Sequence, residues 1–150
     1  MIRFTVERVV RASPAELYGW MSDYSDRDYT GPNWSPKEGV RRSVSEQDAQ
    51  YAVFTDFYGR TTLNYRATKQ PPFGVEVEGV GTNMNAHVSL KVSPVTDGSK
   101  LVVEFRFEPQ GAAKLFAGLM SGAIVRATTR QVDSFLADLS AVRAGTPRDS

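Results

Sequence analysis

Residues 40–109 contain six consecutive segments in which polar and apolar residues alternate, and this repetition constrains the fold more than any other feature. Alternation with a period of two is typical of half-buried β-strands. The predicted strands cover about residues 40–47, 50–58, 60–69, 74–82, 85–96 and 99–109, and a further one covers residues 2–11. Short turn-like segments separate the six, most clearly at Asp97-Gly98. Neighbouring strands should therefore pair as an antiparallel meander.

A sheet with one apolar face needs a second layer that covers this face. The only segment long enough is residues 112–143, which contains no proline and would measure about 48 Å as a helix. Its apolar positions drift around the helix axis, as expected for a helix that lies across a twisted sheet. We therefore predict an α+β fold, with a seven-stranded curved antiparallel sheet wrapped around a long C-terminal helix and two short helices after the first strand.

The first short helix has a clear start signal. Ser13 can accept a hydrogen bond from a backbone amide of the first turn, Pro14 suits the first helical position, and Glu16 completes a capping box. Residues 22–39 are predicted to be a short broken helix and a loop. Residues 144–150 are predicted to be a flexible tail, so that one domain spans residues 1–143.

Several short motifs accompany this order of elements: the segment Val10 to Asp23 with its Ser-Pro-Ala-Glu start, Glu78-Gly79-Val80-Gly81 before a strand, the hairpin Thr96 to Leu101, and the final helix. Together they resemble the START-related superfamily, also called SRPBCC, which includes birch-pollen-allergen-like proteins and polyketide cyclases. The resemblance covers essentially the whole chain and implies a helix-grip fold with a cavity. It implies no single reaction, because members bind lipids, sterols, polyketides or plant hormones, or act as cyclases, hydrolases or protein-binding modules.

Composition excludes several classes of function. The chain has no cysteine, which excludes disulfides and thiolate chemistry, and its net charge of +1 argues against nucleic-acid binding. The longest apolar run, residues 115–125, is far shorter than the roughly 20 residues needed to cross a bilayer. We expect a cytoplasmic protein without a cofactor, and a homodimer is compatible with the sequence.

No set of residues forms a recognisable catalytic or metal site. His87 is the only histidine, and the strand pattern places it on the outer face. Asp23, Asp26 and Asp28 lack the spacing, the glycine and the terminal glutamate of a calcium-binding EF-hand loop. We interpret these aspartates as a solvated turn with helix-capping carboxylates.

The alternation assigns the inward face directly in the last two strands. There the inward residues are Ala86, Val88, Leu90 and Val92, and Leu101, Val103, Phe105 and Phe107. For residues 50–58 two phases are open. We favour the phase that turns inward Tyr51, Val53, Thr55 and Phe57, together with Leu63, Tyr65 and Ala67 of the next strand. The alternative turns Phe54 and Asp56 inward and desolvates a carboxylate at a cost in free energy.

With the favoured phase, the sheet and the helix would enclose an apolar pocket with a few polar groups, which is the usual composition of a small-molecule site. The predicted ligand-binding residues are Trp34 at the mouth, Tyr51, Thr55, Phe57, Tyr65 and Phe105 on the sheet, and Phe116, Met120 and Ile124 on the helix. The alternative that these side chains only fill the core stays open.

Three functions fit this pattern, in order of preference. The first is binding or transport of a hydrophobic or amphipathic small molecule, such as a lipid, a sterol or a polyketide. The second is a cyclase or aromatase of polyketides that uses Tyr65, Thr55 and Arg8 as acid–base or hydrogen-bonding groups. The third is a protein-interaction module that uses the loop with Tyr24, Tyr29 and Trp34.

Overall fold

A computed structural model describes residues 1–35 and 39–144 of the chain. The strands are β1 (Ile2–Val10), β2 (Val40–Gln47), β3 (Tyr51–Tyr58), β4 (Thr61–Gln70), β5 (Gly74–Gly81), β6 (Met84–Val95) and β7 (Gly98–Pro109). The helices are α1 (Pro14–Met21), the short 3-10 helix η2 (Gly111–Phe116) and α2 (Ala117–Arg143). These bounds follow the predicted strands to within about two residues.

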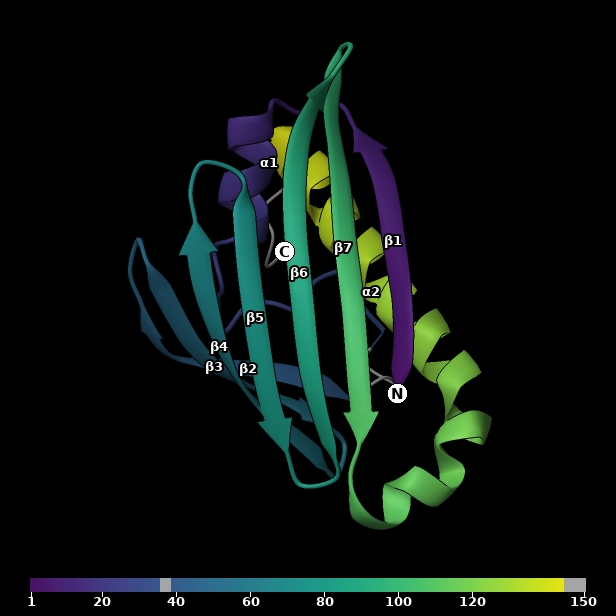
Figure 1. Cartoon of the computed structure of the whole chain (residues 1–150). Coiled ribbons are helices and arrows are strands. Elements are labelled where there is room, and N and C mark those ends of the chain that lie inside the picture. Colours follow the sequence, from purple (N-terminus) through teal and green to yellow (C-terminus); the bar gives the residue numbers. More distant parts are fainter. Residues whose placement is uncertain (36–38, 145–150) are drawn as a thin grey trace.

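The seven strands form one antiparallel sheet in the order β1-β7-β6-β5-β4-β3-β2. Each neighbour from β2 to β7 is also the next strand in the sequence, which confirms the meander. The first strand joins the edge formed by the last one, with Ile2 opposite Phe107. Figure 1 shows that the sheet curves strongly and that α2 runs across its concave side. The fold is therefore the helix-grip arrangement expected from the sequence.

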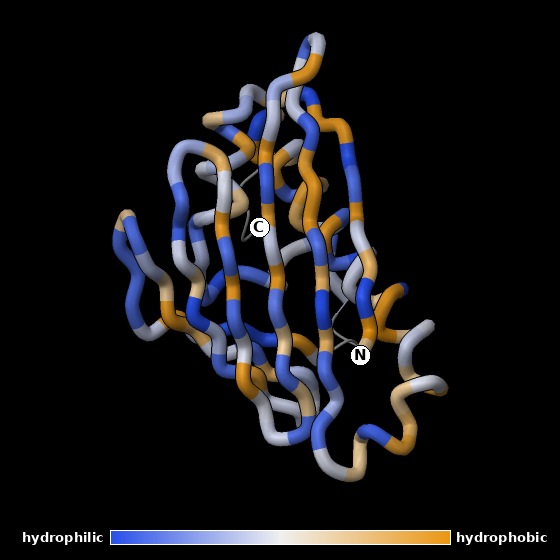
Figure 2. The backbone as a smooth tube through the Cα atoms, viewed as in Figure 1, coloured by the Kyte–Doolittle hydropathy of each residue, from blue (hydrophilic) through white to orange (hydrophobic). Residues whose placement is uncertain are grey.

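The alternation of the strands explains which face of the sheet carries the core. Along each strand in Figure 2, hydrophobic and hydrophilic positions follow one another. The inward residues of β6 and β7 are those predicted, and Leu101 is completely buried. Val75 of β5 and Leu17 of α1 are also completely buried. The core therefore lies between the concave face, α1 and the C-terminal part of α2.

α1 begins as the sequence predicts. The hydroxyl of Ser13 accepts a hydrogen bond from the backbone amide of Glu16 at 3.1 Å, and Pro14 occupies the first turn. Two hydrogen bonds then attach the helix to its surroundings: the Tyr18 hydroxyl donates to the carbonyl oxygen of Gly74, and the Trp20 indole donates to that of Phe135 in α2. α1 thus fixes the end of α2 that covers the core.

The second short helix and the C-terminal tail are the two predicted segments that the structure does not confirm. Residues 22–35, where a second short helix was expected, form turns and bends, and residues 36–38 lie outside the described part. Of the predicted tail, only Ala144 is described. The long C-terminal helix is confirmed, but the first five residues of the predicted range, 112–116, belong to the 3-10 helix η2.

The hydroxyl of Ser13 should contribute measurably to stability. Replacing Ser13 by alanine removes the acceptor for the Glu16 amide, and loss of such a cap typically lowers the free energy of unfolding by about 1 kcal/mol. Urea unfolding followed by circular dichroism would measure this change. Ser140→Ala, at an exposed position of α2, is the control and should change stability by much less; equal effects of the two variants would refute the capping role.

Candidate functional site

A cavity of about 330 Å³ lies between the concave face of the sheet and α2. Its walls are mainly apolar and come from β3 to β7 and one face of α2. They include Leu63, Val77, Val88, Leu90, Val103, Phe105, Phe107, Met120, Ile124, Ala127 and Val132. Met84 and Met120 among the lining residues are partly exposed, whereas Asp28, Arg42 and Asp56 are buried. We refer to this buried charged cluster as the polar end of the cavity.

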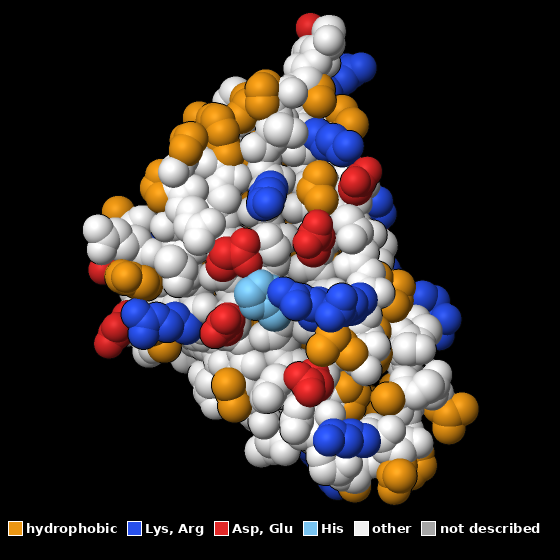
Figure 3. Space-filling model, viewed as in Figure 1, with side chains coloured by type: hydrophobic (Ala, Val, Ile, Leu, Met, Phe, Trp, Pro, Cys, Tyr) orange, Lys and Arg blue, Asp and Glu red, His pale blue; other side chains and the backbone are white. Residues whose placement is uncertain are grey.

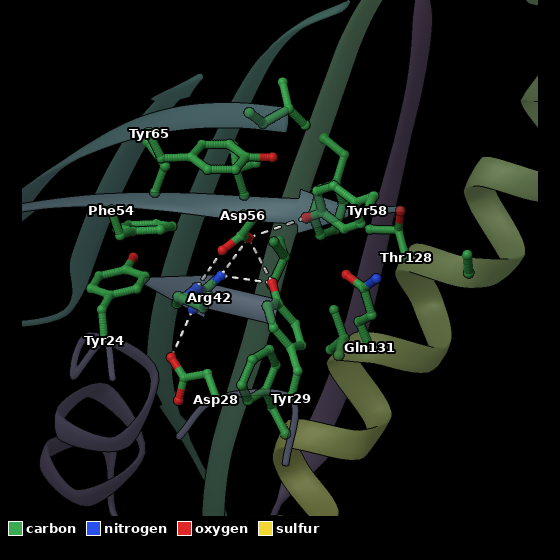
Figure 4. A pocket seen from close by; sticks show the side chains of 18 of the residues that line it. Tyr24, Asp28, Tyr29, Arg42, Phe54, Asp56, Tyr58, Tyr65, Thr128 and Gln131 are labelled. Atoms are coloured by element: carbon green, nitrogen blue, oxygen red, sulfur yellow. Dashed lines mark hydrogen bonds and ion pairs between the residues drawn. The ribbon is translucent and has the colours of Figure 1, made fainter. Parts of the chain in front are cut away.

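Arg42 and Asp56 form the centre of the polar end (Figure 4). The guanidinium donates from Nε to Asp56 Oδ1 at 2.7 Å and from Nη2 to Oδ2 at 2.9 Å, a two-pronged contact that suits both planar groups. Its third nitrogen, Nη1, donates to Asp28 Oδ2 at 2.8 Å. All three side chains are buried, with exposed fractions of 9%, 1% and 3% for Arg42, Asp56 and Asp28.

Two tyrosine hydroxyls complete this network. The Tyr29 hydroxyl donates to Asp56 Oδ2 at 2.8 Å and accepts from Arg42 Nη2 at 2.7 Å. The Tyr58 hydroxyl donates to the same carboxylate oxygen at 3.1 Å. Asp56 therefore accepts four hydrogen bonds, which offset much of the cost of removing its charge from water.

Aromatic rings surround the guanidinium. Its central carbon lies 4.4 Å from the ring centre of Phe54, 4.8 Å from that of Tyr29 and 5.3 Å from that of Tyr24. The rings also stack on one another, with Tyr24 against Phe54 at 4.4 Å and Phe54 against Tyr65 at 5.2 Å. Cation–π attraction thus supports a cation that would otherwise be poorly solvated.

Burial keeps the tyrosines protonated. Loss of solvent raises the pKa of Tyr29 and of Tyr58 well above that of free tyrosine, although the nearby charge of Arg42 lowers both in part. Burial likewise raises the pKa of Tyr24 and, with the negative charge of Asp56, that of Tyr65. At neutral pH these hydroxyls act as hydrogen-bonding groups and not as anions.

Strand register creates this arrangement. Arg42 of β2 lies directly opposite Asp56 of β3, and Phe54 lies directly opposite Tyr65 of β4. Directly opposed residues of antiparallel strands project to the same face, so both pairs point into the concave side. The loop after α1 then adds Asp28 and Tyr29 from a segment distant from both strands.

The favoured phase of residues 50–58 was wrong, and the alternative is correct. Ala52, Phe54 and Asp56 face inward, whereas Tyr51, Thr55 and Phe57 face away from the cavity. Tyr51 is 40% exposed. On the outer face the Thr55 hydroxyl donates to the side-chain oxygen of Asn64, and Phe57 lies beneath the guanidinium of Arg41. The desolvation cost that disfavoured an inward Asp56 is offset by Arg42, which the sequence analysis did not consider.

The length of the turn between β3 and β4 would have indicated the correct phase of β3. Gly59 and Arg60 form a two-residue turn, so Tyr58 pairs with Thr61, and Gly59 has the positive φ of 62° that such turns often need. This register places each even-numbered residue of β3 opposite an odd-numbered residue of β4. An inward Tyr65 therefore requires an inward Phe54, and it excludes an inward Thr55.

The other predicted site residues divide into two groups. Tyr65, Phe105, Met120 and Ile124 line the cavity, although their contact with a ligand remains a prediction. Trp34 is buried beside it and donates its indole N–H to Asp138 at 2.8 Å, and Phe116 is 53% exposed and does not line the cavity. Arg8, considered for acid–base chemistry, pairs with Asp133 of α2 and does not line the cavity either. Arg42, Asp28 and Tyr58 were not predicted as site residues. Tyr29 was expected, with Tyr24 and Trp34, on an exposed loop for protein interaction, but all three side chains are buried.

The aspartates of the first loop were interpreted as a solvated turn with helix-capping carboxylates, which is wrong for Asp28: it is 3% exposed and pairs with Arg42. Asp26 accepts a hydrogen bond from the backbone amide of Val44, and Asp28 accepts one from that of Ser25. Within residues 1–35 and 39–144, no group of three or more histidine, cysteine, aspartate or glutamate residues could hold a metal ion. These aspartates shape the polar end of the cavity by organising the loop.

Comparisons with known proteins give one family and many similar folds. Residues 1–142 match the protein family described as polyketide cyclase / dehydrase and lipid transport. No curated protein is similar enough to count as a match.

Three solved structures illustrate the similarity of fold. Protein TTHA0849 from Thermus thermophilus is 15% identical, with a TM-score of 0.68 over 91% of this chain and 93% of that chain. Ara h 8.0201 is 14% identical, with a TM-score of 0.62 over 93% and 97% of the two chains. The di-domain ARO/CYC StfQ from the steffimycin biosynthetic pathway is 12% identical, with a TM-score of 0.71 over 97% of this chain and 52% of that one. At these identities the similarity shows the fold alone.

The buried tyrosines should make the protein less stable in alkali. Tyrosines with a raised pKa stay protonated in the folded state, whereas the unfolded chain releases their protons above a pH of about 10. Above the pKa of about 10 in the unfolded chain, each such tyrosine lowers the free energy of unfolding by about 1.4 kcal/mol per pH unit. Well below this pH the same tyrosine has no effect on the pH dependence of stability. Urea unfolding between about pH 9 and pH 11 should show a steep fall.

Tyr65→Phe tests the assignment because it removes one of these protons. Relative to the unmodified chain, the alkaline slope should become shallower by about 1.4 kcal/mol per pH unit. An identical slope in both proteins would contradict the burial of this hydroxyl.

Proposed function

The chain belongs to the family described as polyketide cyclase / dehydrase and lipid transport, and from this premise we propose that it binds one uncharged, largely apolar small molecule in the cavity. The family match agrees with the resemblance drawn from the sequence motifs. The ligand would lie along the apolar walls, with a hydroxyl or carbonyl group directed at the polar end. A volume of about 330 Å³ is at the lower limit of the roughly 300–1,000 Å³ typical of small-molecule sites.

The balance of charge at the polar end carries the proposal. Two carboxylates, Asp28 and Asp56, surround the single guanidinium of Arg42 and occupy three of its nitrogen atoms. A ligand carboxylate would therefore meet a formal excess of negative charge in a site where water cannot screen it. A hydroxyl or carbonyl group can instead exchange hydrogen bonds with the tyrosines without bringing a charge.

Tyr58, Thr128 and Gln131 are partly exposed polar groups of the cavity wall. All three line the cavity, and Figure 4 shows Tyr58 of β3 facing the side of α2 that carries the other two. Together they place a phenol, a hydroxyl and an amide around the same space. A few polar groups among apolar walls orient a ligand without requiring that it be charged.

Filling the cavity should weaken binding without removing any polar contact. Ala127 of α2 lines the cavity, whereas Ala123, one turn earlier, is exposed and does not. We expect Ala127→Trp to weaken binding of the fluorescent probe naphthol by about tenfold or more, because an indole would occupy much of the space that a small ligand needs. Ala123→Trp is the matched control and should bind as the unmodified chain does.

The same titration tests the charge argument. Naphthol should bind more tightly than naphthoate, the carboxylate of similar size and ring structure, by about tenfold or more, which corresponds to about 1.4 kcal/mol. Equal affinity would refute the role of the two aspartates. No saturable binding of either probe, together with no small molecule retained in native mass spectrometry, would contradict the proposed function.

A polyketide cyclase is the second candidate, and the Tyr58–Asp56 contact favours it. Tyr58 lines the cavity and its hydroxyl donates its single proton to Asp56; a ligand carbonyl that displaced this contact would accept the proton instead and could be activated for enolisation. The raised pKa of Tyr58 argues that it would stabilise a developing oxyanion and would not itself release a proton at neutral pH. Ligand binding, which needs no proton transfer, is therefore the preferred function.

Incubation with a poly-β-ketone thioester distinguishes the two candidates. A cyclase that uses Tyr58 should lose about 10²–10³-fold in rate on Tyr58→Phe, the typical effect of losing one oxyanion donor. Tyr51→Phe, on the outer face of the same strand, should have no effect. If the unmodified chain and both variants form product only at the uncatalysed rate, the cyclase function is refuted and ligand binding is retained.

A further inference from the structure

Four large apolar side chains are exposed to solvent at the start of the C-terminal helix. In η2 and the first turn of α2, Leu115 is 82% exposed, Leu119 84%, Phe116 53% and Met120 39%. We refer to these four residues as the helix-start patch. Figure 1 shows this segment projecting beyond the edge of the sheet, and Figure 3 shows hydrophobic side chains gathered in the same region. Contiguous exposed apolar side chains of this kind are typical of interaction surfaces.

The charged residues of the segment that carries the helix-start patch are all basic. From Pro109 to Val132 the sequence contains no aspartate or glutamate, but it contains Lys114, Arg126 and Arg130, while Glu108, just before this segment, is exposed. Lys114 lies within η2, and Arg126 lies two turns after Leu119 on α2; both are exposed. A partner that covers this surface should therefore be apolar at its centre and negatively charged around it.

The helix-start patch is continuous with the cavity. Met120 belongs to both, because its side chain is 39% exposed and also lines the cavity. Ile124 and Ala127, on the following turns of the same helix face, line it further inside. A molecule that leaves an apolar phase at the patch would thus meet a mainly apolar path into the cavity.

We propose that the helix-start patch docks on a lipid bilayer with anionic headgroups and that the ligand enters the cavity from this bilayer. Amphipathic segments with leucine and phenylalanine on one side and lysine or arginine nearby lie in the bilayer interface in this way. The inference rests on the proposed function, because it names the source of the ligand. No helix in the described part of the chain is long and apolar enough to cross a membrane, so the contact is interfacial.

A second copy of the chain fits the helix-start patch less well. Pairing two identical patches would bring Lys114 and Arg126 of one copy close to the same residues of the other, and like charges repel when water is removed between them. An anionic bilayer supplies both the apolar phase and the opposite charge. Self-association is therefore an alternative that the experiment must be able to detect.

Vesicle flotation of the full chain tests this proposal. We expect the protein to float with vesicles of phosphatidylcholine and phosphatidylglycerol, and to float much less with phosphatidylcholine alone. Binding to the anionic vesicles should weaken as salt is added, because salt screens the attraction between exposed charges. Absence of binding to both kinds of vesicle would overturn the proposal.

Substitutions in the helix-start patch locate the contact. The double variant Leu115→Ser with Leu119→Ser should lower the vesicle partition coefficient by about tenfold for each leucine that no longer enters the interface. The matched control is Val9→Ser with Val80→Ser, two valines that are 73% and 64% exposed on strands of the sheet. This control should float as the unmodified chain does, and equal loss in both double variants would overturn the proposal.

Binding of soluble naphthol separates this proposal from the proposed function. Leu115 and Leu119 do not line the cavity, so the leucine variant should bind naphthol as tightly as the unmodified chain while it loses vesicle binding. Vesicle binding without any naphthol binding would contradict the proposed function and leave the docking surface intact. A vesicle-free dimer in analytical ultracentrifugation that the leucine variant converts to monomers would assign the patch to a second copy and overturn the docking on lipid.

Discussion

Arg42 and Asp56 face each other across β2 and β3 in the wall of a cavity, where both side chains are largely removed from bulk water. A buried charge is tolerated only when it is paired and its hydrogen-bonding capacity is used. That requirement brings together Asp28, Tyr29 and Tyr58 and surrounds the guanidinium with aromatic rings. The loop after α1, the edge of the sheet and the polar end of the cavity are therefore held by one network.

This network also limits what the cavity can recognise. Because the carboxylates of Asp28 and Asp56 already occupy the guanidinium, Arg42 is poorly suited to bind an incoming anion, although an arginine in a pocket commonly does so. Neutral hydroxyl and amide groups of Tyr58, Thr128 and Gln131 also line the cavity. These groups are the basis of our proposal that the cavity orients an uncharged molecule. Met84 and Met120, which also line the cavity, are apolar and partly exposed.

Patterns within short segments predicted much of the fold correctly. The alternation of β6 and β7 identified inward residues such as Leu90 and Phe105, and the Ser13 start of α1 is a contact within one helical turn. The phase of β3 was mistaken because Asp56 was judged alone, as a carboxylate that should avoid burial. The two-residue turn at Gly59 and Arg60 could have corrected it, since turn length fixes the register between β3 and β4.

Local patterns were sufficient to establish the type and order of most helices and strands, since the alternation of residues, caps and turns act between neighbours in the chain. They also established that a single long helix must cover the sheet. Which polar groups meet inside depends on the folded chain: Asp28, Arg42 and Asp56 come from a loop and two strands, and their pairing has no counterpart in any local pattern. The exposure of Phe116 and Leu119 likewise follows from tertiary packing, because the apolar periodicity of a helix shows which residues share a face but not how far the sheet extends beneath it.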